Sequence, residues 1–205
     1  MPILLLIRHG ENDYLKKGRL PGRLPGIHLN KTGRAQAEAL AEKLRGAPVK
    51  AIYSSPLERA LETAEPIAQA LGLEILPRPA LVDTDVGEWQ DRTIKGLRRL
   101  KAWRQVQAYP SLVKFPGGEA FRETQQRVVN EIETLRLQHE DKELFICVSH
   151  ADPIKLAVAF YLGIPFDLFQ RLVVSPASIT ALQLGEDGSR LLTLNYDVSF
   201  TFATP

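Results

Sequence analysis

The stretch ILLLIRHGE at residues 3–11 decides how the rest of the chain is arranged. Five apolar residues run without a polar break, which is typical of a short strand buried on both faces. The run stops at Arg8, His9 and Gly10, a cation, an imidazole and a conformationally free glycine. Ligands bind at the carboxyl ends of strands in open α/β sheets, so this strand end is a candidate site. By themselves these residues do not separate a ligand site from an ordinary strand end.

The composition is that of a globular protein with a real core. The chain has 205 residues, 44% of them hydrophobic and 24% charged, which fits one domain or one domain with an insertion. A formal net charge of +2 is too small to predict binding to nucleic acid or to an anionic membrane. No apolar run approaches the ~18 residues of a membrane span, and the apolar start is too short for a signal peptide. We therefore expect a soluble, cytoplasmic protein.

Strand and helix patterns alternate along the chain. The expected strands are 3–7, 51–54, 73–76, 144–148, 178–184 and 191–196. The expected helices are 32–45, one that starts at Ser54-Ser55-Pro56 with a serine N-cap and ends at Gly72, 93–107, 119–138 and 153–162. This alternation predicts an α/β fold, a three-layer sandwich with a mainly parallel central sheet, helices on both faces and an antiparallel edge. We expect a single domain over 1–205, with 92–118 as a small cap-like insertion.

Two buried strands of this pattern end in the same way. The first is followed by Arg8 and His9, and the fourth by Ser149 and His150. The carboxyl ends of parallel strands lie at one edge of the sheet, and Arg59, one turn into a helix that follows another strand, can reach the same edge. Arginine offers planar, paired donors suited to phosphate. Two arginines and two histidines at this edge therefore predict a pocket for a tetrahedral dianion.

The residue types in this pocket favour phosphoryl transfer. A neutral imidazole is a competent nucleophile toward phosphorus, and two neighbouring guanidinium charges lower its pKa. The same charges stabilise the negative charge of the transition state. An acidic side chain from the segment 81–88 can give the leaving oxygen a proton. No zinc motif is visible, and we expect neither a metal nor a cofactor. Cys147, inside an apolar strand, is interpreted as a buried core residue and not as a nucleophile.

Several motifs in the chain, taken in order, carry a family resemblance. They are RHGE at 8–11, TGRAQA at 32–37, YSSPLERA at 53–60 with TA at 63–64, PGGE at 116–119 and VSH at 148–150. With these motifs the chain resembles the histidine phosphatase superfamily, also called the phosphoglycerate mutase-like family. The match covers most of the chain, and each motif falls on the expected element.

The resemblance implies roles for the matching residues. His9 would form a phosphohistidine intermediate, and Arg8, Arg59 and His150 would hold the phosphoryl group. The acid of this family follows a leucine and one further residue, ahead of a glycine-tryptophan segment. The run LVD at 81–83 before GEW at 87–89 matches that layout, so Asp83 is the predicted proton donor.

The sequence also departs from the family pattern. The usual acid is glutamate, and Asp85 and Glu88 are therefore the alternatives to the shorter Asp83. Asn12 stands where serine or threonine is common and is predicted to bind phosphate. Ala151 replaces a glycine, and its backbone amide can still donate to phosphate. Leu15 replaces an asparagine and cannot donate, so Asn12 or the basic loop 11–30 is expected to substitute for it.

We predict a metal-independent phosphatase that acts on a small phosphorylated metabolite or a phosphorylated side chain. One alternative is a cofactor-dependent phosphoglycerate mutase, although the chain lacks the extra length and arginine-rich motifs of that branch. Another is a weakly active phosphate-binding regulatory domain. No glycine-rich dinucleotide fingerprint follows the first strand. His28 and His139 are interpreted as surface histidines, and Trp89 and Trp103 as packing residues. The substrate and the oligomeric state stay open, a homodimer being one option.

Overall fold

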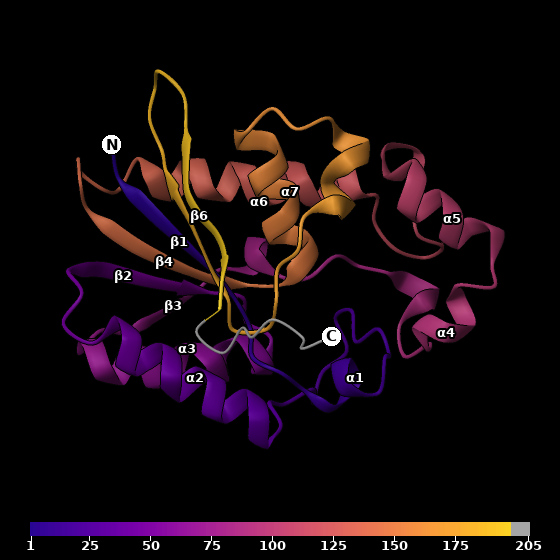
Figure 1. Cartoon of the computed structure of the whole chain (residues 1–205), viewed down its shortest axis with the longest axis horizontal. Coiled ribbons are helices and arrows are strands. Elements are labelled where there is room, and N and C mark those ends of the chain that lie inside the picture. Colours follow the sequence, from indigo (N-terminus) through magenta and orange to yellow (C-terminus); the bar gives the residue numbers. More distant parts are fainter. Residues whose placement is uncertain (198–205) are drawn as a thin grey trace, which may run out of the picture.

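The structure is a computed structural model that describes residues 1–197 (Figure 1). The described part contains a six-stranded sheet in the order β3-β2-β4-β1-β5-β6. The strands are β1 (Ile3–Arg8), β2 (Val49–Ser54), β3 (Ile75–Pro77), β4 (Leu144–Ser149), β5 (Ile179–Gln183) and β6 (Arg190–Tyr196). The strands from β3 to β1 are parallel, β5 is antiparallel to β1, and β6 is antiparallel to β5. The expected α/β fold, with a mainly parallel sheet and an antiparallel edge, is confirmed.

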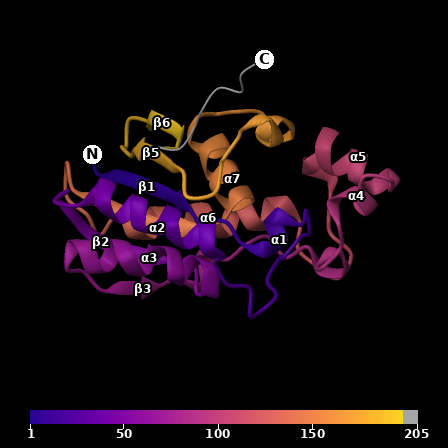
Figure 2. The same ribbon diagram turned by 60° about the horizontal axis from the view of Figure 1, so that its bottom comes forward.

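Helices cover both faces of the sheet (Figures 1 and 2). One face carries α2 (Lys31–Leu44) and α3 (Glu58–Leu71), and the other carries α6 (Phe121–Arg136) and α7 (Ala151–Tyr161). In β1, Leu5 and Ile7 pack with α2 and α3, whereas Leu4 and Leu6 pack with α6 and α7. Successive side chains of a strand point to opposite faces, so burial on both faces requires the uninterrupted apolar run.

The carboxyl ends of β1 and β4 lie side by side. In the parallel register Arg8 is opposite Ser149, and the His9 backbone N–H donates to the Ser149 carbonyl at 3.0 Å. His9 and His150 therefore leave the sheet at the same edge, as the two similar strand ends predicted.

The expected helix 93–107 is wrong, because the structure has two shorter helices there. They are α4 (Ile94–Leu97) and α5 (Lys101–Ala108), and Leu100 between them has extended backbone angles of −80° and 140°. Leu97 and Val106 both join the same apolar cluster. The break lets each short helix turn one apolar residue onto that cluster.

Other helices and strands also begin or end at residues different from those expected. The expected strand 73–76 begins only at Ile75, because Leu73 still completes the end of α3 by donating its N–H to the Ala68 carbonyl at 3.1 Å. Gly72 permits this closure with a φ of 67°. The remaining described helices are short: α1 (Asp13–Lys16), η1 (Pro79–Leu81), η2 (Gly87–Trp89), η3 (Pro110–Leu112) and η4 (Phe166–Arg171). Within residues 1–197, none of the helices is long and apolar enough to cross a membrane.

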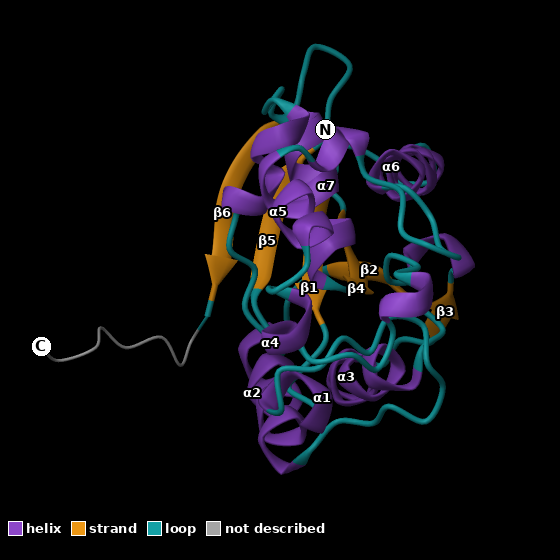
Figure 3. Ribbon diagram, turned by 90° about the vertical axis from the view of Figure 1, so that its right-hand side faces the viewer, coloured by secondary structure: helices purple, strands orange, loops and turns teal. Residues whose placement is uncertain are grey.

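The segment 92–118 carries α4, α5 and η3 at the end of the molecule toward which β1 and β4 point (Figures 1 and 3). Trp89 is 4% exposed and stacks on Trp103 with ring centroids 6.1 Å apart. Phe115 and Phe121 continue this cluster toward α6 and α7. The segment 92–118 therefore rests on the main body through aromatic packing, and the two tryptophans have the packing role expected of them.

Candidate active site

His9 lies directly after β1 and is 2% exposed. Its Nδ1 is 2.8 Å from the Gly10 carbonyl oxygen. A carbonyl can only accept, so Nδ1 carries the proton and Nε2 keeps its lone pair. Burial, followed by the charges of Arg59 and Arg8, holds the pKa of His9 well below its usual value. The ring is therefore neutral at pH 7, with Nε2 unprotonated.

The chain around Gly10 fixes the position of this ring. The Gly10 N–H donates to the Thr63 hydroxyl at 3.0 Å, and that hydroxyl donates to the Arg59 carbonyl at 2.7 Å. A Cβ on Gly10 would lie 2.7 Å from the Gly33 carbonyl oxygen, and one on Gly33 would lie 2.0 Å from the Glu11 carbonyl oxygen. The two glycines let α2 approach the backbone that follows His9.

The two arginines expected at this edge are present there. Arg59, on α3, is 0% exposed, and its Nη2 donates to the Gly22 carbonyl at 2.7 Å and to Asp83 Oδ2 at 3.3 Å. Arg8 Nη1 donates to the Val174 carbonyl at 2.6 Å. Within residues 1–197, Arg8 Nε and the Nε and Nη1 atoms of Arg59 are buried without a hydrogen-bond partner. These donors are free to bind an anion.

His150, at the end of β4, faces His9 with the ring centroids 5.1 Å apart. Its Nε2 is 2.9 Å from the Ser55 hydroxyl, and its Nδ1 is 3.7 Å from Asp83 Oδ2. Burial and then the charge of Arg59 hold the pKa of His150 well below its usual value. When the Ser55 hydroxyl donates to Nε2, the proton of the neutral ring lies on Nδ1, on the side of Asp83.

The expected serine N-cap is wrong, because α3 begins at Glu58 with Leu57 as its N-cap. The Leu57 N–H lies 3.4 Å from the Ser55 hydroxyl oxygen, which is long for a hydrogen bond. The shorter bond of this hydroxyl is to His150. Sequence reasoning missed Ser55 as a site residue, although it lies inside the YSSPLERA motif. Its contact with His150 spans 95 positions of the chain, and no local pattern reveals such a partner.

Asp83 is the acidic residue that the structure brings to the histidines and arginines. Its side chain is 18% exposed and contacts Arg59, while Oδ1 accepts from the Thr84 N–H at 3.0 Å. Burial raises the pKa of Asp83 to about 6, although Arg59 acts in the opposite direction. The alternatives lie outside this group: Asp85 Oδ1 accepts from the Gly87 N–H of its own loop at 2.9 Å, and Glu88 is exposed.

Asn12 and Ala151, the other two predicted phosphate ligands, lie at the starts of two helices. Asn12 is 0% exposed, and its Oδ1 accepts from the Leu15 N–H at 2.9 Å as the N-cap of α1. Its Nδ2 is buried without a partner among the described residues and can donate to an anion. Ala151 is the first residue of α7, where a backbone N–H has no acceptor inside the helix. The loop 11–30 borders the site through the Gly22 carbonyl.

No group of three or more histidine, cysteine or acidic side chains within residues 1–197 is arranged to hold a metal ion. Cys147 is fully buried in β4, and burial raises the pKa of its thiol. It is a core residue, as expected.

Of the two histidines assigned to the surface, His28 is exposed, but the assignment of His139 is wrong: its side chain is 6% exposed and stacks on Phe145. Its ring lies between the aromatic rings of Tyr53 on β2 and Phe145 on β4, which shield it from solvent.

Comparison with known proteins identifies this arrangement. The family model of the histidine phosphatase superfamily (branch 1) matches residues 4–197. Phosphoserine phosphatase 1 of Hydrogenobacter thermophilus is 30% identical over 194 residues, which are 94% of this chain and 91% of that protein. A 2,3-bisphosphoglycerate-dependent phosphoglycerate mutase of Thermoplasma acidophilum is 29% identical over 198 residues, 95% of this chain and 92% of that protein.

A solved structure shows the same fold. A histidine-to-alanine mutant of phosphoserine phosphatase from Entamoeba histolytica, in complex with phosphoserine, matches with a TM-score of 0.86 at 26% identity. The match covers 95% of this chain and 97% of that one. The chain belongs to the histidine phosphatase superfamily, and the family resemblance seen in its motifs is confirmed. It is a phosphatase of this superfamily.

Proposed function

We propose that the protein is a metal-independent phosphomonoester hydrolase that works through a phosphohistidine on His9. The observation that carries this proposal is the neutral ring of His9 between two arginines that have unpartnered buried donors. Guanidinium groups pair with phosphoryl oxygens and neutralise the charge that spreads over them in the transition state. The free Nδ1 of His150 and the free Nδ2 of Asn12 supply further donors.

In the first step, His9 Nε2 attacks phosphorus and the bond from phosphorus to the ester oxygen breaks. Asp83 gives its proton to that oxygen, so the alcohol leaves as a neutral molecule. A carboxyl with a pKa of about 6 holds a proton often enough near neutral pH to act as this acid. In the second step, water attacks the phosphohistidine and Asp83 takes its proton. Inorganic phosphate leaves and His9 returns to its neutral form.

The substrate is a small phosphorylated molecule under this proposal, as in the relative bound to phosphoserine. The cap 92–118 stands at the carboxyl end of the sheet and contains lysine and arginine but no acidic residue. Such a surface favours substrates that carry negative charge beyond the phosphoryl group. A mutase activity is the second candidate, supported by the identity to the Thermoplasma mutase.

The test is hydrolysis of an activated aryl phosphate with excess chelator by the wild type and by His9→Ala. We expect chelator-resistant activity that disappears in the variant while the circular dichroism spectrum stays unchanged. Substantial activity of His9→Ala would remove His9 as the nucleophile. Phosphoryl transfer between phosphoglycerates that outpaces hydrolysis would favour the mutase.

A further inference from the structure

The PGGE motif at 116–119 is hydrogen-bonded through its backbone to the segment that follows Asp83. The Glu119 N–H donates to the Asp85 carbonyl at 3.0 Å, and the Glu88 N–H donates to the Pro116 carbonyl at 2.9 Å. A Cβ on Gly118 would lie 2.3 Å from the Asp85 carbonyl oxygen, so this approach requires glycine. The motif therefore brings Glu119 against the acid-bearing segment, a role that neither its sequence nor the proposed chemistry assigns.

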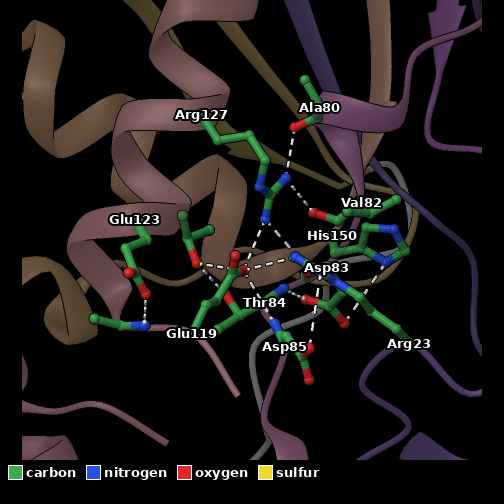
Figure 4. A network of polar contacts seen from close by, with 12 residues as sticks. Arg23, Ala80, Val82, Asp83, Thr84, Asp85, Glu119, Glu123, Arg127 and His150 are labelled. Atoms are coloured by element: carbon green, nitrogen blue, oxygen red, sulfur yellow. Dashed lines mark hydrogen bonds and ion pairs between the residues drawn. The ribbon is translucent and has the colours of Figure 1, made fainter. Parts of the chain in front are cut away.

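The Glu119 carboxylate is the centre of a polar network (Figure 4). Its Oε1 accepts from Arg23 Nη2 and Arg127 Nη2, both at 2.8 Å, and from the Asp85 N–H at 3.0 Å. Its side chain is 17% exposed. Although burial opposes ionisation, hydrogen bonds from Thr124, Asp85 and Arg127 hold the pKa of Glu119 below its usual value. Glu119 is thus an anion shared by two arginines from different parts of the chain.

The same two arginines hold the backbone on both sides of the proton donor. Arg127 Nη1 donates to the carbonyls of Ala80 and Val82 at 2.6 and 3.1 Å, and Arg23 Nε donates to the Asp83 carbonyl at 2.8 Å. Figure 4 shows these bonds converging on one stretch of backbone. The position of the Asp83 carboxyl therefore depends on residues that do not touch it.

We propose that Glu119 is a positioning residue for the proton donor: it anchors Arg23 and Arg127, which hold the backbone at 80–83 so that the Asp83 carboxyl meets the leaving oxygen. This inference rests on the proposed function, in which Asp83 is the acid. Arg23 comes from the loop that also supplies the Gly22 carbonyl to Arg59, so the network links the acid to the phosphate-binding side of the pocket.

The charge of Glu119 has a second, electrostatic consequence. In Glu119→Gln, Arg127 loses the Glu119 carboxylate as counter-ion, and Arg23 keeps only its longer pair with Asp85 Oδ2 at 3.9 Å. Uncompensated positive charge favours the carboxylate, so the pKa of Asp83 falls and the acid loses its proton at lower pH. The other charged or titratable groups facing Asp83 are Arg59 on α3, Arg8 on β1, Asp152 on α7 and His150 after β4, and they stay unchanged in the variant.

The experiment compares the wild type with Glu119→Gln and with the matched control Glu42→Gln, which breaks an exposed pair with Arg45 on α2. Rates are measured on an alkyl phosphate, whose leaving oxygen needs a proton, and on an activated aryl phosphate, which needs little. We expect Glu119→Gln to lose about tenfold in kcat/KM on the alkyl phosphate and less than about threefold on the aryl phosphate. The alkaline limb of the alkyl pH profile should move to lower pH. The control should match the wild type in every measurement.

Arg127→Lys separates the geometry of the network from its charge. Lysine keeps the positive charge but lacks the planar fork that reaches two carbonyls and Glu119 together. We expect slower turnover of the alkyl phosphate with the alkaline limb unmoved. If Glu119→Gln fails to fold, Arg23→Gln is the substitute, on a half-buried side chain. It removes a bond to the Asp83 carbonyl and a positive charge, so turnover of the alkyl phosphate should slow and the alkaline limb should move to higher pH. An unchanged alkyl rate and limb would overturn the proposal. Equal slowing of both substrates with an unmoved limb in Glu119→Gln would overturn the proposal.

Hydrogen exchange of the backbone amides at 81–85 gives a readout independent of turnover. We expect faster exchange in Glu119→Gln than in the wild type or in Glu42→Gln, because the held backbone opens more often. Unchanged exchange would contradict the proposal even if the phosphatase chemistry holds. Activity that survives in the His9→Ala variant would instead contradict the proposed function.

Discussion

Two buried histidine environments in this protein differ in what their ring nitrogens contact. His139 has partners on both nitrogens: Tyr53 Oη lies 3.2 Å from Nε2, and Glu143 Oε2 lies 3.4 Å from Nδ1. Its ring also stacks on Phe145 with the centroids 4.4 Å apart. In the pocket, His9 bonds through Nδ1 and His150 through Nε2, and each leaves its second nitrogen to the pocket.

Under the proposed function, this difference separates a histidine held for packing from one that takes part in the reaction. Burial alone does not make the distinction, because all three side chains are shielded from water. A histidine with both nitrogens bonded and its ring stacked is held for packing. One with a free nitrogen beside unpartnered guanidinium donors is held for a ligand. Substitutions in the two environments should therefore separate activity from stability.

After His9→Ala, the largest effect is expected for Arg59→Met, which keeps the bulk of the side chain and removes its charge. The Arg59 guanidinium is fully buried and offers two unpartnered donors to the phosphoryl group. Loss of such electrostatic stabilisation should lower kcat/KM about 10³-fold on an activated aryl phosphate. Arg45→Met, which removes an exposed guanidinium, is the control. A loss below tenfold would show that the buried donors do not act on the transition state.

Asp83→Asn should come next, and its effect should depend on the leaving group. We expect about a 10²-fold loss in kcat/KM on an alkyl phosphate and a much smaller loss on an activated aryl phosphate. The wild-type rate on the alkyl phosphate should also fall as the pH rises through about 6, where Asp83 loses its proton. The pH profile of the variant should lack this fall. Ionisation of the substrate affects both profiles equally, so the difference between them reports Asp83. Equal slowing of both substrates would argue against Asp83 as the acid.

Ser55→Ala should have a moderate effect, because it removes the partner of His150 Nε2 without touching the ring itself. Without that bond the proton of the neutral ring is no longer directed to Nδ1, and we expect about a tenfold drop in kcat/KM. Ser55→Thr keeps the hydroxyl and should restore most of the rate. If Ser55→Thr is as slow as Ser55→Ala, packing and not the hydrogen bond is the cause.

The smallest effect on turnover is expected for His139→Ala. The variant loses the stacking on Phe145 and the contact with the Tyr53 hydroxyl, which keeps only its longer bond to Gln138 Oε1 at 3.5 Å, so the free energy of unfolding should fall by about 2 kcal/mol. Below the melting transition kcat should equal that of the wild type. Denaturant unfolding and steady-state kinetics on the same preparation test both statements. A large fall in kcat with unchanged stability would erase the distinction between the two environments.

Local sequence patterns fail to predict the structure in two places, the segment 92–118 and the segment that follows Asp83. The spacing of Leu97, Leu100, Trp103 and Val106 suits one helix, yet the structure breaks it at Leu100. Packing against the aromatic cluster outweighs local periodicity there: Leu97 and Val106, on separate helices, are both buried in the cluster that holds Trp89 and Phe115. The PGGE motif was visible in the sequence, but its contact with Asp85 depends on chain segments 34 residues apart.

The sequence by itself determined the sheet and the identity of the principal pocket residues. One apolar run ends at Arg8 and His9 and another ends at His150, and parallel strands place such ends at one edge of the sheet. That the two strands are neighbours is a result of the structure. The tertiary structure alone decided that Ser55 orients His150, that His139 is covered, and that Glu119 anchors the arginines around Asp83. These are contacts between side chains far apart in the chain. Their energy comes from burial and partner geometry, which local periodicity does not encode.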